Sequence, residues 1–183
     1  MRIIAGESRG IILVSPSDDK VRPTPNRIRE ALFSILGSFE DCTVFDAFAG
    51  TGALGCEAIS RGATRACFAD SATTSIELIT ENVKRVDGGD RSQIFKGSYD
   101  YALAKMDFDP DIVFLDPPYN QGLTNLALKT MSTAPRITAG CLVIAEQHVD
   151  EEPCAHPDFE LDDERVYGSI RLRFFVRNEP AQE

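Results

Sequence analysis

The chain has 183 residues, 43% of them apolar, and a formal net charge of −10. That length suffices for one well-buried core and is short for two full domains. No apolar run is long enough for a transmembrane helix, and Gly6, Glu7 and Arg9 interrupt the opening segment too early for a signal peptide. The composition thus excludes a membrane-spanning helix, and we expect a soluble, cytoplasmic protein without membrane contact.

The charges are unevenly distributed. Residues 1–30 carry six basic against four acidic residues, whereas residues 150–164 carry eight acidic residues and no Lys or Arg. The acidic run is typical of a solvated loop and strand edge. Because phosphate neutralisation needs basic side chains, any RNA-binding surface is expected to be local.

The five cysteines form no C-x-x-C pair, which predicts buried, reduced thiols. Cys154 and His156, with His148 nearby, have poor spacing for a zinc site. We therefore expect no metal.

The start of the chain predicts a hairpin followed by a helix. RIIAGESRGIILV contains two short β-like runs around a polar, glycine-containing loop, so residues 1–23 are interpreted as an N-terminal β-hairpin extension that contacts RNA. In RPTPNRIREALFSILG, Thr24 can cap a helix and Pro25 suits its first position. Helical spacing then continues to Gly37 and places Ile28, Ala31, Leu32, Ile35 and Leu36 on the apolar face.

From Cys42 onward, apolar strands alternate with helical segments. The strands are TVFDAF, ACFAD, SQIFKG, DIVFLD and CLVIAE, and the helices span roughly 53–61, 73–86, 99–105 and 122–134. This alternation predicts a parallel sheet with helices on both faces. FELDDERVYG and SIRLRFFVRN then predict an antiparallel hairpin at the sheet edge. We expect an α/β, Rossmann-like domain at 24–178 with a mostly parallel seven-stranded sheet, and a polar tail at 179–183.

The stretch FDAFAGTGALG contains G-x-G-x-x-G from Gly50 to Gly55, a pattern typical of dinucleotide-binding turns. Asp70, about twenty residues further on, could accept hydrogen bonds from a ribose of either NAD or S-adenosylmethionine (SAM). Asp46 separates the two cofactors. A carboxylate at the strand end would repel a pyrophosphate but suits a cationic amino group, such as the methionine end of SAM. The loop therefore predicts SAM rather than NAD.

The strand DIVFLD ends in Asp116-Pro117-Pro118-Tyr119. The proline pair fixes the backbone and leaves carbonyl groups free. An exocyclic amine on a base is a poor nucleophile, and the Asp116 side chain and the Pro117 carbonyl can accept its two hydrogens while Tyr119 stacks on the base. The carboxylate also stabilises the cationic nitrogen that forms. The four residues predict direct methyl transfer without a metal, although DPPY taken alone would also suit a plain strand-ending turn.

Together, RIIAGESRG, RPTPNRIREALFSIL, FDAFAGTGALGCEAISRGA and DPPY resemble, in this order, the bacterial RsmD-type methyltransferases, which modify guanine N2 in small-subunit ribosomal RNA. The resemblance covers nearly the whole chain. It implies a class I SAM-dependent methyltransferase fold with an N-terminal hairpin. It also implies methyl transfer to a guanine in the 3′ major region of 16S rRNA, within a 30S subunit or an assembly intermediate, with S-adenosylhomocysteine as the other product. We expect a monomer, since the sequence has no obvious dimer motif.

The resemblance also implies the site residues. Ala72 departs from the acid or Asn common in the family, and Ser98-Tyr99 departs from its common Asp-Ala. For the arginines among the RNA contacts, a solubilising role or pairing with local acids is the alternative. The implied SAM-binding residues are Asp46, Ala47, Phe48, Ala49, Gly50, Thr51, Gly52, Asp70, Ser71, Ser98 and Tyr99; the catalytic residues are Asp116, Pro117, Pro118 and Tyr119; and the RNA contacts are Arg9, Arg22, Thr24, Arg27 and Arg29.

Two other functions stay open at this point. One is methyl transfer to a different planar nitrogen, such as adenine in RNA or DNA or a protein glutamine. The other is a SAM-binding scaffold that assists ribosome assembly without catalysis. The basic N-terminal segment favours RNA over glutamine, and the absence of a sequence-reading DNA module argues against DNA.

Overall fold

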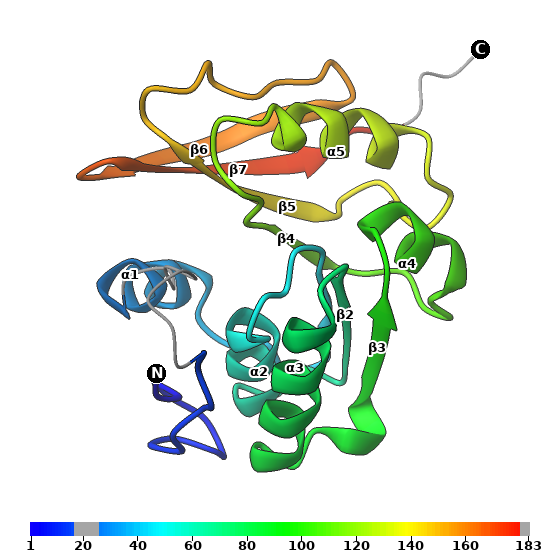
Figure 1. Ribbon diagram of the computed structural model, residues 1–183. Helices are drawn as coiled ribbons and strands as arrows, with labels where there is room; N and C mark the ends of the chain where they lie inside the picture. Colours follow the sequence, from blue (N-terminus) through cyan, green and yellow to red (C-terminus); the bar gives the residue numbers. More distant parts are fainter. Residues whose placement is uncertain (17–25, 180–183) are drawn as a thin grey trace.

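A computed structural model describes residues 1–16 and 26–179 of the chain (Figure 1). None of the helices in these ranges is long and apolar enough to cross a membrane. The strands are β1 (Thr43–Asp46), β2 (Arg65–Asp70), β3 (Ser92–Lys96), β4 (Ile112–Leu115), β5 (Leu142–His148), β6 (Phe159–Tyr167) and β7 (Ile170–Arg177). The helices are α1 (Asn26–Leu36), α2 (Ala53–Ser60), α3 (Thr73–Arg85), α4 (Tyr99–Lys105) and α5 (Leu123–Ser132), with a 3-10 turn at Gly89–Arg91.

The seven strands form one sheet in the order β3-β2-β1-β4-β5-β7-β6. Strands β1 to β5 are parallel, and β7 pairs antiparallel with both β5 and β6. The predicted alternation and the predicted antiparallel hairpin at the edge are therefore confirmed. The chain moves outward from β1 to β3 and then returns to β4 beside β1. Ligands of such folds bind at this reversal, at the edge where the parallel strands end, which we call the carboxyl edge.

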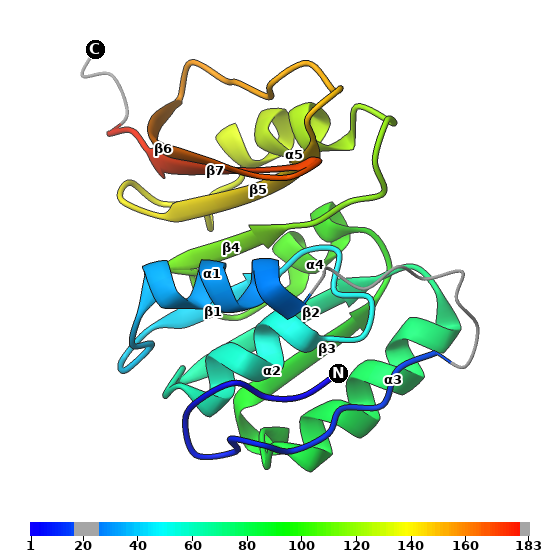
Figure 2. The ribbon, with the colours of Figure 1, turned by 90° about the vertical axis from the view of Figure 1, so that its left-hand side faces the viewer.

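Residues along each strand alternate between two hydrophobic cores. Helices α1, α2 and α3 cover one face of the sheet, called the α1 face, and α4 and α5 cover the other (Figure 2). Val44, Phe68, Phe114, Ile144 and Leu172 point to the α1 face, whereas Phe45, Cys67, Val113, Val143 and Phe175 point to the opposite face. Because the side-chain period of a strand is two, the face of each residue at the carboxyl edge follows from this alternation.

The N-terminal segment folds back on itself and packs into the core of the α1 face. The Ile3 N–H donates to the carbonyl of Ile11 over 2.9 Å. The buried Glu57 carboxylate on α2 accepts the N–H groups of Ile4 and Ala5, over 2.8 and 3.0 Å. Residues 1–16 thus share a core with the main domain. The rest of the predicted extension, with Thr24 and Pro25, lies outside the described residues.

The buried face of α1 is rotated from the predicted one. Ile28, Arg29, Leu32 and Phe33 are buried, whereas Ile35 is 44% exposed. The apolar pattern also allowed a stripe through Ile35, and packing of Phe33 against the sheet selects the other stripe. As a result Arg29 lies inside the protein.

The three glycines of the motif have two different purposes. Gly50 and Gly52 have φ of +54° and +75°, in the left-handed region that favours glycine. Gly55 instead lies against the Phe68 ring, and a Cβ at this position would be 2.2 Å from a ring carbon. The first two glycines therefore shape the turn, and the third lets α2 pack on β2.

Gly55→Ala is expected to lower the free energy of unfolding by about 1–3 kcal/mol, because the added methyl must displace Phe68 or tilt α2. Gly89→Ala is the matched control, since no atom lies within 4 Å of the position of its Cβ. Urea denaturation measures both variants. Equal stability of the two would contradict the packing role of Gly55.

Candidate active site

Four acidic side chains stand in a row across the carboxyl edge on the α1 face. Asp70 ends β2, Asp46 ends β1, Asp116 directly follows β4, and Glu146 lies near the end of β5. The predicted residues Asp46, Asp70 and Asp116 are therefore brought together. Within residues 1–16 and 26–179, no group of three or more His, Cys, Asp and Glu is arranged to hold a metal ion.

The strand register fixes the order of this acidic row. Asp46 is paired with Phe68 of β2 and Phe114 of β4. Asp70 and Asp116 each lie two residues beyond those partners, so they point to the same face and stand further out. Asp46 is therefore the most deeply placed acid of the row, and Asp70 and Asp116 lie further toward solvent on either side of it.

Asp46 is the most deeply placed of these acids, with 1% of the residue exposed. Its Oδ2 accepts the N–H of Gly55, in the first turn of α2, over 3.1 Å. Burial raises the pKa of Asp46 to about 7; the Gly55 N–H opposes this shift, and the nearby Asp116 and Asp70 add to it. A cationic group placed beside Asp46 would favour its charged form.

Asp70 orders the glycine loop. Its Oδ2 accepts the N–H of Gly50 over 2.9 Å, and its Oδ1 accepts the N–H of Ala72 over 2.8 Å. Each carboxylate oxygen has a further lone pair, so the side chain can also accept a hydroxyl. Ser71 is exposed next to it.

Ser98 and Tyr99 lie beside this loop but differ in environment. The Gly97 N–H donates to the Asp70 carbonyl over 3.0 Å, which places the exposed Ser98 close to the acidic row. Tyr99 is buried, and its ring centroid lies 5.3 Å from that of Phe48. Tyr99 therefore supports the loop from below through Phe48.

The four residues of the DPPY segment differ in their exposure to solvent. Asp116 and Tyr119 are half-buried, Pro117 is buried, and Pro118 is exposed. The Tyr119 hydroxyl donates to Oε1 of Glu146, which holds the tyrosine ring against β5.

Glu146 was missed by the sequence analysis. It is 5% exposed, and its burial, together with the negative charge of Asp116, raises its pKa. Asp116 and Glu146 line one small hollow, whose walls include the apolar side chains of Leu32, Leu54 and Leu172. The signal was available: CLVIAE is an apolar strand that ends in an acid, as are the strands that end in Asp46 and Asp70.

Asn82 on α3 was also missed, and no local pattern indicates it. The residue is fully buried. Its Nδ2 donates to the carbonyl of Thr51 over 2.9 Å, and its Oδ1 accepts the N–H of Val14 over 2.7 Å. One side chain therefore ties the glycine loop to the N-terminal segment.

The predicted RNA contacts other than Arg29 separate into three groups. Arg27 is exposed at the start of α1. The end of α1 is held at the opposite edge, where Arg61 donates to the Phe33 carbonyl over 3.0 Å, so Arg27 lies toward the carboxyl edge (Figure 2). Arg9 is exposed, but the N–H of the preceding Ser8 donates to Oγ of Ser60 at the end of α2 over 3.0 Å, so Arg9 lies at the edge opposite the acidic row. Arg22 and Thr24 lie outside the described residues.

Arg29 is a correction to the prediction. It is 1% exposed, and its guanidinium donates to the carbonyl of Arg2. Desolvation by burial lowers its pKa, while Glu57 opposes this shift. A side chain in this position does not reach RNA phosphates, and Arg29 instead fastens α1 to the N-terminal segment.

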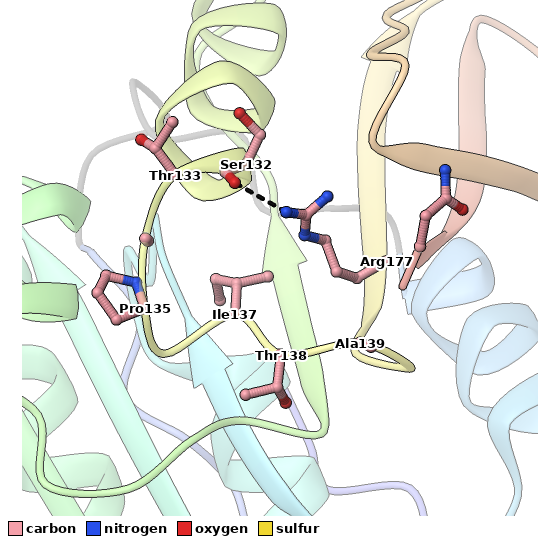
Figure 3. Close-up of a pocket in the computed structure, with 9 residues that line it drawn as sticks. Ser132, Thr133, Pro135, Ile137, Thr138, Ala139 and Arg177 are labelled. Atoms are coloured by element: carbon pink, nitrogen blue, oxygen red, sulfur yellow. Dashed lines mark hydrogen bonds between the residues drawn. The ribbon is translucent and has the colours of Figure 1, made fainter. Parts of the chain in front are cut away.

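A wider hollow, of about 370 Å³, lies away from the acidic row (Figure 3). It is formed by the end of α5, the following loop and the end of β7, where Arg177 donates to the carbonyl of Ser132 over 2.9 Å. β5 begins and β7 ends there, so this hollow faces the edge opposite the candidate site.

Comparison with known proteins identifies the family of the chain. Residues 1–176 match the family described as "Conserved hypothetical protein 95". Ribosomal RNA small subunit methyltransferase D of Escherichia coli K12 is 30% identical over 179 residues, which cover 97% of this chain and 90% of that protein. Putative rRNA methyltransferase YlbH of Bacillus subtilis is 28% identical over 182 residues, covering 97% and 99%.

Solved structures show the same fold. A putative methyltransferase, yhhF, from Escherichia coli superposes with a TM-score of 0.85 at 30% identity, covering 98% of this chain and 99% of that one. An RNA methyltransferase from Salinibacter ruber, in complex with S-adenosyl-L-homocysteine, gives 0.64 at 14% identity, covering 88% and 97%. The predicted class I methyltransferase fold is therefore confirmed.

The raised pKa of Asp46 predicts a pH-dependent stability. The native state keeps a proton that the unfolded chain releases between pH about 4 and about 7, so the free energy of unfolding should fall as pH rises through that range. Asp46→Asn keeps the side-chain shape and should weaken this dependence. Urea unfolding at several pH values measures it, with the exposed Asp162→Asn on β6 as control. An Asp46→Asn protein with the wild-type dependence would show that another group is responsible.

Proposed function

The chain belongs to the family described as "Conserved hypothetical protein 95", that of the RsmD-type methyltransferases, and from this membership we propose that it methylates the N2 amine of a guanine in small-subunit ribosomal RNA, with SAM as methyl donor. The observation that carries the proposal is the position of Asp116-Pro117 directly after β4, beside the buried Asp46 at the end of β1. This is the point where the strand order reverses.

The described residues fit SAM. Asp46 is a buried carboxylate whose raised pKa makes a cationic partner favourable, and it receives the amino group of the methionine end. No atom lies within 4 Å of the position of a Cβ on Gly50, so the loop backbone is open to a ligand. Residues 47–52 line the methionine side, Asp70 accepts the ribose hydroxyls, and Ser71 and Ser98 border the adenine. The buried Tyr99 contributes by supporting Phe48. Bound there, SAM supplies an electrophilic methyl on its sulfonium.

The acceptor base enters beside Asp116. The Asp116 carboxylate and the Pro117 carbonyl accept the two amine hydrogens, which turns the nitrogen lone pair toward the methyl. Tyr119, held by its hydroxyl bond to Glu146, offers its ring to the base. A target base inside a helix must leave its stack to reach this position.

The charges balance through Asp116. The N–C bond forms as the C–S bond breaks, the positive charge passes from sulfur to nitrogen, and S-adenosylhomocysteine is left. The nearby carboxylate stabilises the cationic nitrogen and then accepts one proton, which it passes to water.

The RNA partner is 16S rRNA within a 30S subunit or an assembly intermediate, and the protein acts as a cytoplasmic monomer. Because the chain carries a net charge of −10, RNA contact is restricted to basic residues near the site, with Arg27 the best placed of the described candidates. Arg9 contributes only if the RNA also reaches the opposite edge.

Asp116→Ala should reduce methyl transfer by about 10²–10³-fold, because the variant loses the acceptor of the amine hydrogen and the stabilising charge. SAM affinity, measured by calorimetry, should change little. Incorporation of tritiated methyl from SAM into 30S subunits from cells that lack this gene measures the reaction. Asp162→Ala, an exposed change on β6, is the control.

Mass spectrometry of the nucleosides from that reaction identifies the acceptor. N2-methylguanine is the expected product, methyladenine would move the assignment to another planar nitrogen, and an unmodified RNA would rule out the proposed reaction. Full cellular function of Asp116→Ala would instead support the non-catalytic assembly role.

A further inference from the structure

We propose that Glu146 determines the choice of base, by accepting the N1–H of the guanine whose N2 amine is held by Asp116. The inference rests on the proposed function and adds a specificity-determining residue to it. Its basis is the position of Glu146 beside Asp116, where both side chains line one small hollow that is otherwise apolar.

The register of β4 and β5 places the two acids side by side. Leu115 is paired with Ala145, so the next residues of the two parallel strands, Asp116 and Glu146, occupy neighbouring positions. Ile144 packs in the core of the α1 face, and Glu146, two residues on, points the same way. Strands lie about 4.8 Å apart, so two acceptors can serve adjoining N–H groups of one base.

The surroundings of Glu146 make its hydrogen bonding selective. Leu32 of α1, Leu54 of α2 and Leu172 of β7 form apolar walls around the two carboxyl groups. In such a site a base that lacks the matching donor leaves a buried acceptor unpaired, and this penalty gives strong discrimination.

Guanine matches this pair of acceptors. Its N2 amine and its N1–H are adjacent donors on one edge, so Asp116 and Glu146 each receive one. Adenine places an acceptor nitrogen beside its amine, and a glutamine side chain places a carbonyl there. Either would direct a lone pair at the Glu146 carboxylate.

The charged form of Glu146 is the one that accepts N1–H, so its surroundings set a pH dependence. Burial and the negative charge of Asp116 raise the pKa of Glu146, and the Tyr119 hydroxyl opposes that rise. Among the described residues, the other elements that line the hollow present Leu32, Leu54 and Leu172, and His148 lies two residues further along β5. Methyl transfer should therefore increase as pH rises and Glu146 loses its proton.

Glu146 also accepts the hydrogen bond that positions Tyr119. The experiment must therefore separate recognition of the base by Glu146 from positioning of Tyr119. Glu146→Gln keeps the size of the side chain but removes the carboxylate. Tyr119→Phe keeps the ring and removes only its hydroxyl bond to Glu146. Glu160→Gln, an exposed change on β6, is the matched control.

The measurement is kcat/KM for 30S subunits lacking the modification, from tritiated methyl transfer across a pH series. It is made at saturating SAM, whose amino group keeps Asp46 charged, and SAM affinity is determined by calorimetry. Glu146→Gln keeps one neutral acceptor oxygen in place of the charged carboxylate, so it should lose only about tenfold in kcat/KM. It should also lose the increase with pH, while SAM affinity stays near that of the wild type. Tyr119→Phe should lose less and keep the increase. Glu160→Gln should match the wild type.

The outcomes separate the two proposals. If wild-type protein forms no N2-methylguanine, the proposed function fails. If it does, and Glu146→Gln keeps the wild-type kcat/KM or falls only as far as Tyr119→Phe with the pH profile intact, Glu146 does not read the base. A wild-type kcat/KM that does not change with pH overturns the inference as well, even if the Gln variant does not fold.

Discussion

The burial of the Asp46 carboxyl group at the end of β1 is the constraint on which the rest of the site depends. Removing a charged group from water is costly, and one N–H from Gly55 offsets only part of the cost for Asp46. The raised pKa of Asp46 reflects the imbalance that is left. A cationic ligand removes this imbalance, so the free energy lost in burying the acid favours binding. The glycine loop, the start of α2 and the neighbouring acids are all arranged around this group.

Helix α2 connects this site to the N-terminal part of the chain. An N–H of its first turn donates to Asp46, and Glu57 in its second half accepts N–H groups from residues 4 and 5. Arg61, which caps the end of α2, donates to the Phe33 carbonyl near the end of α1. Asn82 adds a further link between the glycine loop and the N-terminal segment. Helix α1 also forms a wall of the hollow beside Asp116 through Leu32, so the N-terminal segment is in contact with elements of both halves of the site.

The sequence predicted the strands, the helices and three of the four acids because these features depend on local periodicity and on position at a strand end. Glu146, like Asp46, is an acid at the end of an apolar stretch. It was not predicted because no recognised motif follows CLVIAE. The burial of Arg29 and Asn82 could not be predicted from local patterns. A helix pattern does not say which polar residue turns inward, since that depends on the carbonyl of Arg2 or on Val14, far away in sequence.

The acidic row has a consequence for the turnover of the proposed reaction. Methyl transfer leaves the spent cofactor with one positive charge fewer than the one that entered. Four carboxyl groups within the same small region attract the more positive molecule more strongly, and their mutual repulsion returns once that charge is neutralised. The carboxyl edge would thus bind the positively charged methyl donor more tightly than the product that remains after the reaction, which favours exchange of the product for a new donor.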